Sequence, residues 1–522
     1  MMFMLLSCLS LYAADNDLIT EQITIKLEKA GTLPDRIANS EMYKITNLKI
    51  IGEINGTDLK MIREMAGSNY TDGKLSVLDL SEAKIVEGGD YYYKDYNDYN
   101  DYYTSNDVIG NYAFYDCSRL TSLNLPAGIT EIGDYAFFLC SRLTSLTFPA
   151  GITSIGRYAF KGCSGLTSLN LPAGITEIGD YAFYSCSGLT SLNLPAGITW
   201  ISNHVFEGCS GLTSLTLPAG ITKIGSYAFH DCSGLTSLTL PAGITKIGTW
   251  AFYGCSGLTS LTLPAGITKI GEGTFYGCSG LTSLTLPAGI TSIRKSAFES
   301  CSGLTSLNLP AGITEIGESA FDGCSGLTSL TLPAGITSIR YATFSGCRGL
   351  TSLNLPAGIT EIGGNAFSWC SGLTSLNLPA GITEIGYRTF LGCSGLTSLN
   401  LPAGINWIGE SAFSWCSGLT SIYVYAEKVP KIDSKAFEGV DAKKCTLYVP
   451  MGTHDDYWLS DFGDYFENIV EFDATGIDKT TTSTDVEEVA RYSVNGQRLS
   501  APTKGLNIVK YSDGSVKKVA VR

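Results

Sequence analysis

The sequence has few of the side chains on which catalysis and metal binding depend. It contains only three histidines, His204, His230 and His454, in 522 residues. No Ser/His/Asp set, metal-ligand spacing or phosphate-binding loop can be assembled from it. Its carboxylates are scattered, and none is singled out by its context. We therefore expect a protein that is not an enzyme and that uses neither a cofactor nor a metal ion.

Positive charge and long apolar runs are also scarce. The chain has 35 Lys and Arg against 49 Asp and Glu, which gives a formal net charge of −14 at pH 7. A nucleic-acid-binding protein needs a basic face, so we do not expect nucleic acid as a partner. No stretch approaches the eighteen or more apolar residues of a membrane-spanning helix, so we expect no transmembrane segment.

Cysteine, by contrast, is abundant and evenly spaced. Fourteen cysteines recur at a fixed interval of 23 residues from Cys117 to Cys416, and the residues around them recur too. The repeated unit, clearest over 159–179, combines Ala-Phe-x-x-Cys, Leu-Thr-Ser-Leu-x-Leu-Pro and Ile-Thr-x-Ile-Gly. A fixed period of this length is typical of a solenoid, in which stacked repeats bury an apolar face that one repeat cannot bury alone.

The spacing of apolar residues within the unit predicts its local structure. Leu169 and Leu171 face one side of a short strand, which Pro172 ends because it has no amide hydrogen. Ile175 and Ile178 indicate a second inward edge, and the Ala-Phe-x-x-Cys segment fits a short 3₁₀ or α turn. We predict a leucine-rich-repeat solenoid of 23-residue repeats, with a parallel β-sheet on one side and short strands or 3₁₀ turns opposite.

The cysteines are interpreted as packing groups rather than reactive groups. None has CxxC or His/Cys spacing, and in-register stacking holds neighbouring thiols too far apart for good disulfide geometry. A free cysteine behaves as a small buried hydrophobe. The predicted structural ladder consists of Cys117, Cys140, Cys163, Cys186, Cys209, Cys232, Cys255, Cys278, Cys301, Cys324, Cys347, Cys370, Cys393 and Cys416.

Shifts in composition and in the repeat frame divide the chain into six parts. These are a signal peptide (1–14), an N-terminal cap with irregular repeats (15–108), the regular array (109–424), a C-terminal cap (425–473), a Thr-rich linker (474–486) and a small all-β module (487–522). Segment 1–14 has the apolar core and small-residue end of a secretory signal, but no basic start. The alternative for Leu6-Ser7-Cys8 is a lipoprotein site. We expect an exported protein.

Two segments interrupt the repeat frame. In the N-terminal cap, Thr57 is predicted to cap a helix that carries Leu59, Ile62 and Met65 on one face. The tyrosine- and aspartate-rich insert 91–103 is interpreted as a solvated loop that contacts a partner, with calcium binding as the alternative. At the other end, Asn-Gly predicts a hairpin over 492–499, followed by strands at 506–509 and 516–521.

Residues that vary between repeats are the candidates for ligand binding. One aromatic column could stack on sugars or bind a protein, or it could only pack laterally. Three successive lysines could attract an anionic partner, or could record recent repeat duplication. The strands also present a flat face of Thr, Ser and Asn. Three interpretations of this face are open: a solvated surface, a broad surface for weak contacts or, because it is regular, an ice-binding array. The candidate residues are Tyr135, Tyr158, Tyr181, His204, Tyr227 and Trp250 in the aromatic column, and Lys223, Lys246 and Lys269 in the lysine column.

The repeated motifs resemble those of the BspA-like leucine-rich-repeat family of bacterial surface proteins, over about 45–472. This resemblance implies a non-enzymatic, exported protein at the bacterial outer surface or outside the cell, which adheres to host matrix proteins or to other cells. The alternative is a carbohydrate-binding module that uses the aromatic column. The tail resembles a type IX secretion sorting domain in Asn495-Gly496, Pro502 and Lys504-Gly505, although Asn507 stands where an aromatic residue is usual.

Overall fold

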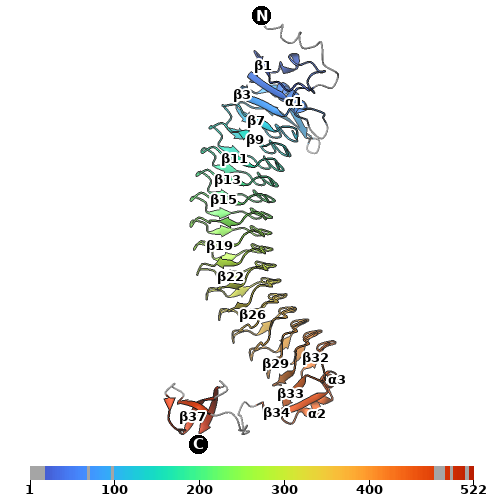
Figure 1. Ribbon diagram of the computed structural model, residues 1–522, viewed down its shortest axis with the longest axis vertical. Coiled ribbons are helices and arrows are strands. Elements are labelled where there is room, and N and C mark those ends of the chain that lie inside the picture. Colours follow the sequence, from blue (N-terminus) through green and yellow to red (C-terminus); the bar gives the residue numbers. More distant parts are fainter. Residues whose placement is uncertain are drawn as a thin grey trace. The chain divides into compact units, whose positions relative to one another are not determined.

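The computed structural model describes residues 18–67, 71–95, 99–474, 488–493, 498–511 and 516–521. The chain divides into two compact units between Val470 and Glu471, and each is described by itself. The expected signal peptide and all but the first residue of the expected linker lie outside the described residues. The larger unit is a continuous stack of coils, with one coil for each 23-residue repeat (Figure 1). It is a leucine-rich-repeat solenoid.

The Leu-x-Leu segment of each repeat forms a short strand of the first parallel sheet. In β11 (Ser168–Asn170) the outer residues are exposed and Leu169 is buried. Ser168 pairs with Ser191 of the next coil, so the register advances by one repeat per strand. Leu171 follows the strand and is only half-buried, at the edge of the core. The other strands on this side are β7 (Ser122–Asn124), β9 (Ser145–Thr147), β13 (Ser191–Asn193), β15 (Ser214–Thr216), β17 (Ser237–Leu238), β19 (Ser260–Thr262), β21 (Ser283–Thr285), β23 (Ser306–Leu307), β25 (Ser329–Leu330), β29 (Ser398–Leu401) and β31 (Ser421–Val424).

The Ile-Thr-x-Ile segment forms a second series of parallel strands, as the sequence predicts. Each strand has two residues, and in most of them the isoleucine is buried while the preceding residue faces outward, as in β12 (Glu177–Ile178); in β22 the preceding residue, Ser292, is buried as well. The outward position tolerates Glu, Ser, Trp or Lys, because only the isoleucine is packed. The remaining members are β6 (Val108–Ile109), β8 (Glu131–Ile132), β10 (Ser154–Ile155), β14 (Trp200–Ile201), β16 (Lys223–Ile224), β18 (Lys246–Ile247), β20 (Lys269–Ile270), β22 (Ser292–Ile293), β24 (Glu315–Ile316), β26 (Ser338–Ile339), β27 (Glu361–Ile362), β28 (Glu384–Ile385), β30 (Trp407–Ile408) and β32 (Lys431–Ile432).

The Ala-Phe-x-x-Cys segment closes each coil with tight turns. The amide of Cys163 donates to the carbonyl of Phe160 (3.1 Å), and the amide of Phe160 donates to Ala182 of the next coil (2.8 Å). The phenylalanines stack along the core from coil to coil, with ring centroids 5.1–5.8 Å apart. Two positions in most of these turns have positive φ, for example Tyr158 (56°) and Gly162 (76°).

The N-terminal cap extends the first sheet in the order β1-β2-β3-β7-β9. Its elements are β1 (Ile23–Leu27), η1 (Leu33–Asp35), β2 (Asn47–Ile54), α1 (Gly56–Ala66), β3 (Val77–Ile85), β4 (Gly88–Asp95) and β5 (Asn100–Thr104). Helix α1 buries Leu59, Ile62 and Met65, but the prediction that Thr57 caps it is wrong. Asn55 is the cap, because its side chain accepts from the Thr57 amide while the Asp58 carboxylate accepts from the Asn55 amide.

The tyrosine-rich insert is not the solvated loop that its composition indicates. Strands β4 and β5 form an antiparallel hairpin, although residues 96–98 at its tip lie outside the described residues. Tyr93 and Tyr102 both pack on Tyr112 of the first coil, with ring centroids 4.8 Å away. Tyr99 and Tyr103 remain exposed. The insert therefore covers the start of the array with aromatic contacts.

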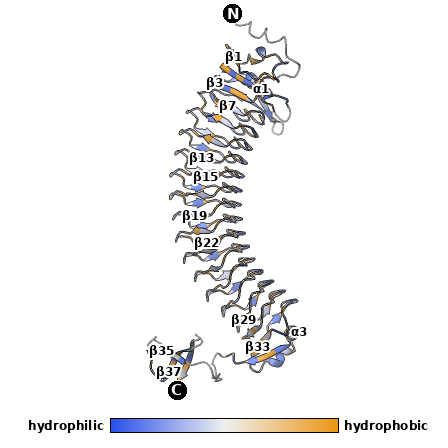
Figure 2. Ribbon diagram, viewed as in Figure 1, coloured by the Kyte–Doolittle hydropathy of each residue, from blue (hydrophilic) through white to orange (hydrophobic). Residues whose placement is uncertain are grey.

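The C-terminal cap ends the phenylalanine stack. It contains β33 (Thr446–Pro450), α2 (His454–Trp458), α3 (Asp461–Tyr465) and β34 (Asn468–Phe472). Phe462 and Phe466 pack on the last ring, Phe437, at centroid distances of 5.9 and 5.1 Å. The hydroxyl of the fully buried Tyr457 donates to the Ala426 carbonyl (2.7 Å). Figure 2 shows hydrophobic segments in end strands such as β3 and β33, and the buried core continues through every coil between them.

The smaller unit is an antiparallel sheet in the order β36-β35-β37-β38. Its strands are β35 (Glu488–Ser493), β36 (Arg498–Leu499), β37 (Gly505–Tyr511) and β38 (Val516–Val521). The predicted pairing across 492–499 is confirmed by the Tyr492–Arg498 register, while the Asn-Gly turn itself lies outside the described residues. The buried Asn507 side chain binds Thr503 through both the amide and the carbonyl of that residue.

Candidate binding surfaces

The cysteine column lies inside the stack, where it cannot meet a ligand. All fourteen repeat cysteines are free thiols, and each is at most 1% exposed. Each Sγ from Cys140 to Cys416 donates to the phenylalanine carbonyl of the preceding coil, as Cys163 does to Phe137 at 3.0 Å. Burial raises the pKa of the repeat thiols from Cys117 to Cys393, for example that of Cys209 to about 12. Among the described residues, no group of His, Cys, Asp or Glu side chains is arranged to hold a metal ion.

The aromatic column forms one stack on the turn side of the solenoid. From Tyr112 through Tyr135, Tyr158, Tyr181 and His204 to Tyr227, successive ring centroids are 4.2–4.8 Å apart and the rings are tilted by 3–12°. All are half-buried, and burial raises the pKa of Tyr135 and of Tyr181. Because each face covers its neighbour, the column presents ring edges to solvent rather than faces. This geometry does not favour the stacking of sugars on the column.

Trp250 leaves this stack. Its ring packs instead on Tyr253 and Tyr276, each at 5.7 Å, and occupies space that Gly273 of the next coil leaves open. Tyr253 and Tyr276 belong to a second column that the sequence analysis did not identify. In that column Tyr115 stacks on Phe138, and His230 stacks on Tyr253. The recurrence of aromatic residues three positions after the first column could have indicated it.

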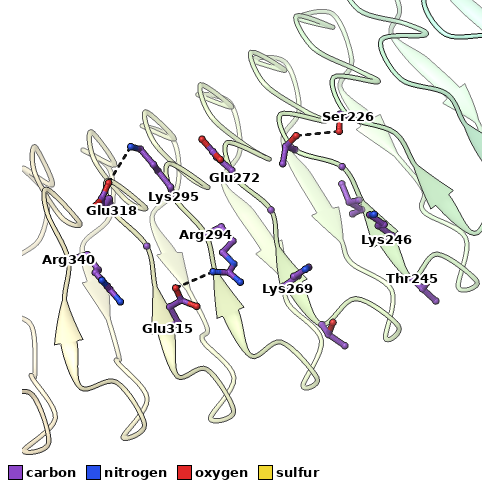
Figure 3. A pocket seen from close by; sticks show the side chains of 16 residues that line it. Ser226, Thr245, Lys246, Lys269, Glu272, Arg294, Lys295, Glu315, Glu318 and Arg340 are labelled. Carbon is purple, nitrogen blue, oxygen red and sulfur yellow. Dashed lines mark hydrogen bonds and ion pairs between the residues drawn. The ribbon is translucent and has the colours of Figure 1, made fainter.

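Lys246 and Lys269 of the lysine column line a groove that crosses several coils on the second-sheet side, whereas Lys223 lies outside its lining. Lys223 is half-buried with its ammonium 5.5 Å from the Trp200 ring, whereas Lys246 and Lys269 are exposed. The groove has a volume of about 650 Å³, and Figure 3 shows the side chains that line it. Its charged residues come from β18, β20 and β24 and from the turns that follow the second-sheet strands. They are Lys246, Lys269, Glu272, Arg294, Lys295, Glu315, Glu318 and Arg340.

Positive charge predominates in this groove, although the chain as a whole is acidic. Arg294 pairs with Glu315 and Lys295 with Glu318, each at 3.2 Å (Figure 3). Over the described residues, Lys246, Lys269 and Arg340 have no ion-pair partner. Like charges on neighbouring strands repel one another, so an anionic ligand that enters the groove would relieve this repulsion.

Sequence reasoning identified the lysines but missed the arginines. Arg294 and Arg340 stand where most repeats have the glycine of Ile-Thr-x-Ile-Gly. A long side chain at this position projects beside the lysine column, as Figure 3 shows for both residues. A comparison of every repeat position for departures from its usual residue would have revealed this half of the groove.

Comparisons with known proteins agree with this architecture. The family model of the BspA type leucine rich repeat region matches residues 107–236, 222–351 and 337–457, together more than half of the chain. The chain therefore belongs to the BspA type leucine-rich-repeat family. No curated protein matches it significantly. Among the described residues, no helix has the length and apolar character needed to cross a membrane.

Solved structures of bacterial leucine-rich-repeat proteins are similar to the chain. A leucine-rich repeat protein from Bacteroides ovatus is 30% identical, with 64% of this chain and 89% of that one covered and a TM-score of 0.48. A leucine rich cell surface protein from Faecalibacterium prausnitzii is 29% identical, with coverages of 62% and 84% and a TM-score of 0.42. Because both TM-scores are below 0.5, the family assignment rests on the repeat model.

Proposed function

We propose that this chain is a non-enzymatic protein of the bacterial cell surface that binds a protein ligand, from host matrix or from another cell, through the charged groove. The observation that carries this proposal is the set of unpaired cations Lys246, Lys269 and Arg340 along one groove of an acidic solenoid. Such a groove selects a ligand segment with acidic side chains, because charge complementarity excludes basic partners and steers acidic ones.

The groove also suits a broad contact rather than an enclosed pocket. Each exposed charge pair contributes only about 0–1 kcal/mol, so affinity must come from several coils that act together. The lining provides five cationic side chains from four of five successive coils, and the flat exterior of a solenoid lets a ligand meet all of them at once. Binding through such exposed charges is predicted to weaken as salt rises from 50 to about 500 mM.

The test is a solid-phase binding assay of the full chain on a panel of purified host matrix and cell-surface proteins. The variant combines Lys246→Glu, Lys269→Glu and Arg340→Gly, residues that other repeats carry at the same positions, as in Glu315 and Gly363. The fold should therefore be unchanged, and binding should fall by roughly tenfold or more. The matched control is Lys431→Glu, an exposed lysine at the equivalent position of β32. If the triple variant bound as well as the natural chain, the groove would not be the binding site.

Export is part of the same proposal. Segment 1–14 supplies the apolar run of a secretory signal, and the sheet β35–β38 is a separate unit that suits a sorting or attachment module. Deletion of 487–522 is predicted to leave the protein inside the cell envelope. The readout is surface labelling of intact cells, with total protein measured by immunoblot as the control. Undiminished surface labelling would contradict the sorting role of the tail.

A further inference from the structure

Two exposed tryptophans stand at an unusual backbone position in the C-terminal coils. Trp369 and Trp415 are 52% and 57% exposed and have φ values of 60° and 61°. Positive φ is uncommon for a bulky residue and comes at no steric cost for glycine. The coils around them have glycine at the equivalent position, in Gly346, Gly392 and Gly439. Local backbone preference therefore does not account for the tryptophans.

Each indole ring lies against the glycine of the next coil. A Cβ on Gly392 would lie 2.5 Å from Cε3 of Trp369, and a Cβ on Gly439 would lie 3.2 Å from Cε3 of Trp415. The absent side chain thus leaves room for the ring on the backbone of the following coil. With one side of each ring on the coil and about half of each residue exposed, the other side faces solvent.

Two hollows flank this pair, and both tryptophans line each of them. The hollows have volumes of about 260 and 410 Å³. Their other lining residues are mainly charged or hydroxyl side chains, and the charged ones include Arg388, Glu410 and Lys435 in the first and Arg348 in the second. No residue is shared with the charged groove. Flat aromatic faces beside hydrogen-bonding groups suit a ligand that has both apolar C–H faces and hydroxyl edges.

We propose that Trp369 and Trp415 form a platform for an extended, β-linked glycan. The two residues are two coils apart, a separation on the order of 10 Å at one strand spacing per coil. In a β-1,4-linked hexopyranose chain, every second sugar presents the same face to one side, at a comparable separation. A protein hot spot would instead need a closed surround that excludes water, whereas both hollows are open to solvent and are lined in part by charged and serine side chains.

The experiment measures binding of the full chain to immobilised β-1,4-linked hexasaccharides of glucose, of N-acetylglucosamine and of mannose. The variant is Trp369→Gly with Trp415→Gly. Since glycine is the usual residue at this position and adopts a positive φ without strain, the variant should form the same solenoid, which its far-UV circular dichroism spectrum checks. The natural chain is expected to bind at least one hexasaccharide, and the variant to bind it roughly tenfold more weakly or worse.

The control is Trp458→Ala, which removes a similarly exposed tryptophan from α2 and should leave glycan binding unchanged. The proposal is overturned if the natural chain binds none of the three hexasaccharides, or if the double glycine variant binds as well as the natural chain. It is also overturned if the double variant loses only the protein ligand found for the charged groove. The triple groove variant should retain glycan binding, which keeps the two sites distinguishable.

Discussion

At the scale of the residue, the repeat cysteine combines two properties that one buried position requires. It must be small and apolar enough for the centre of the stack, and it must donate to a phenylalanine carbonyl of the preceding coil, as Cys209 does to Phe183 (3.1 Å). Alanine would leave that carbonyl without this donor, and serine would bury a more polar group. The period of cysteines thus reflects packing and hydrogen bonding rather than reactivity.

Burial of these thiols predicts loss of stability in alkali. Burial raises the pKa of Cys209 and of Cys370 from an ordinary value of 9.0 to about 12, so the folded state favours the protonated thiol. This contribution is complete below about pH 9 and is lost as the pH rises toward 12. In that range each such thiol lowers the free energy of unfolding by about 1.4 kcal/mol per pH unit, and the effects of many thiols add.

Circular dichroism melts should therefore show a Tm that is level between pH 6 and 8 and falls steeply above pH 9. Cys209→Ala should lower the Tm at pH 7, because it removes a packed donor, and should make the alkaline slope shallower. A Tm that stays level up to pH 11 would mean that the thiols are not held in a closed interior.

The stacked rings of the aromatic column make a second residue-scale contribution. Tyr158 lies between Tyr135 (4.7 Å) and Tyr181 (4.5 Å). Tyr158→Ala should lower the free energy of unfolding by about 1–3 kcal/mol through two lost ring contacts. Urea titration measures this change, and Ser319→Ala, in a coil that has no aromatic ring at this column position, should have almost no effect. Equal stability of both variants would mean that the column does not hold neighbouring coils together.

At the scale of the element, helix α1 depends on a carboxylate that the sequence did not single out. Asp58 is fully buried and accepts from the amides of Gly31 (2.6 Å), Leu33 (2.8 Å) and Asn55 (2.9 Å). One side chain thus ties the helix start to the loop around η1. The cap Asn55 could have been predicted from the local Asn-x-x-Asp spacing, whereas the other two partners of Asp58 lie 25 and 27 residues earlier and could not.

Asp58→Asn should destabilise the N-terminal cap by roughly 2–3 kcal/mol, because charge-assisted bonds are lost and one amide donor faces other donors. Thr57→Ala should cost less, since its hydroxyl accepts a single exposed bond from Asp90. Hydrogen exchange of α1 amides measures both changes. If the Thr57 variant lost more protection from exchange than the Asp58 variant, Asp58 would not be the main residue that holds the start of α1.

At the scale of the whole molecule, regular features were predictable from the sequence and singular ones were not. The 23-residue period and the spacing of Leu169, Ile175 and Ile178 were sufficient to predict both series of strands, because each coil repeats the same local contacts. The hairpin of β4 and β5 could not be inferred, since its tyrosines find their partner on Tyr112, beyond the insert. The arginines of the groove and the pair of Trp369 and Trp415 were missed because they are departures from the repeat.

The central claim is that near-identical coils form one in-register stack, with recognition confined to its exterior. The most direct test deletes one whole coil and measures both unfolding and ligand binding. Deletion of 256–278 joins Cys255 to Ser279 and removes Lys269 from the groove, while deletion of 164–186 removes a coil outside it. Both chains should fold and unfold cooperatively, and only the first should bind the protein ligand more weakly, by roughly tenfold. Failure of either chain to fold, or equal binding by both, would contradict the account.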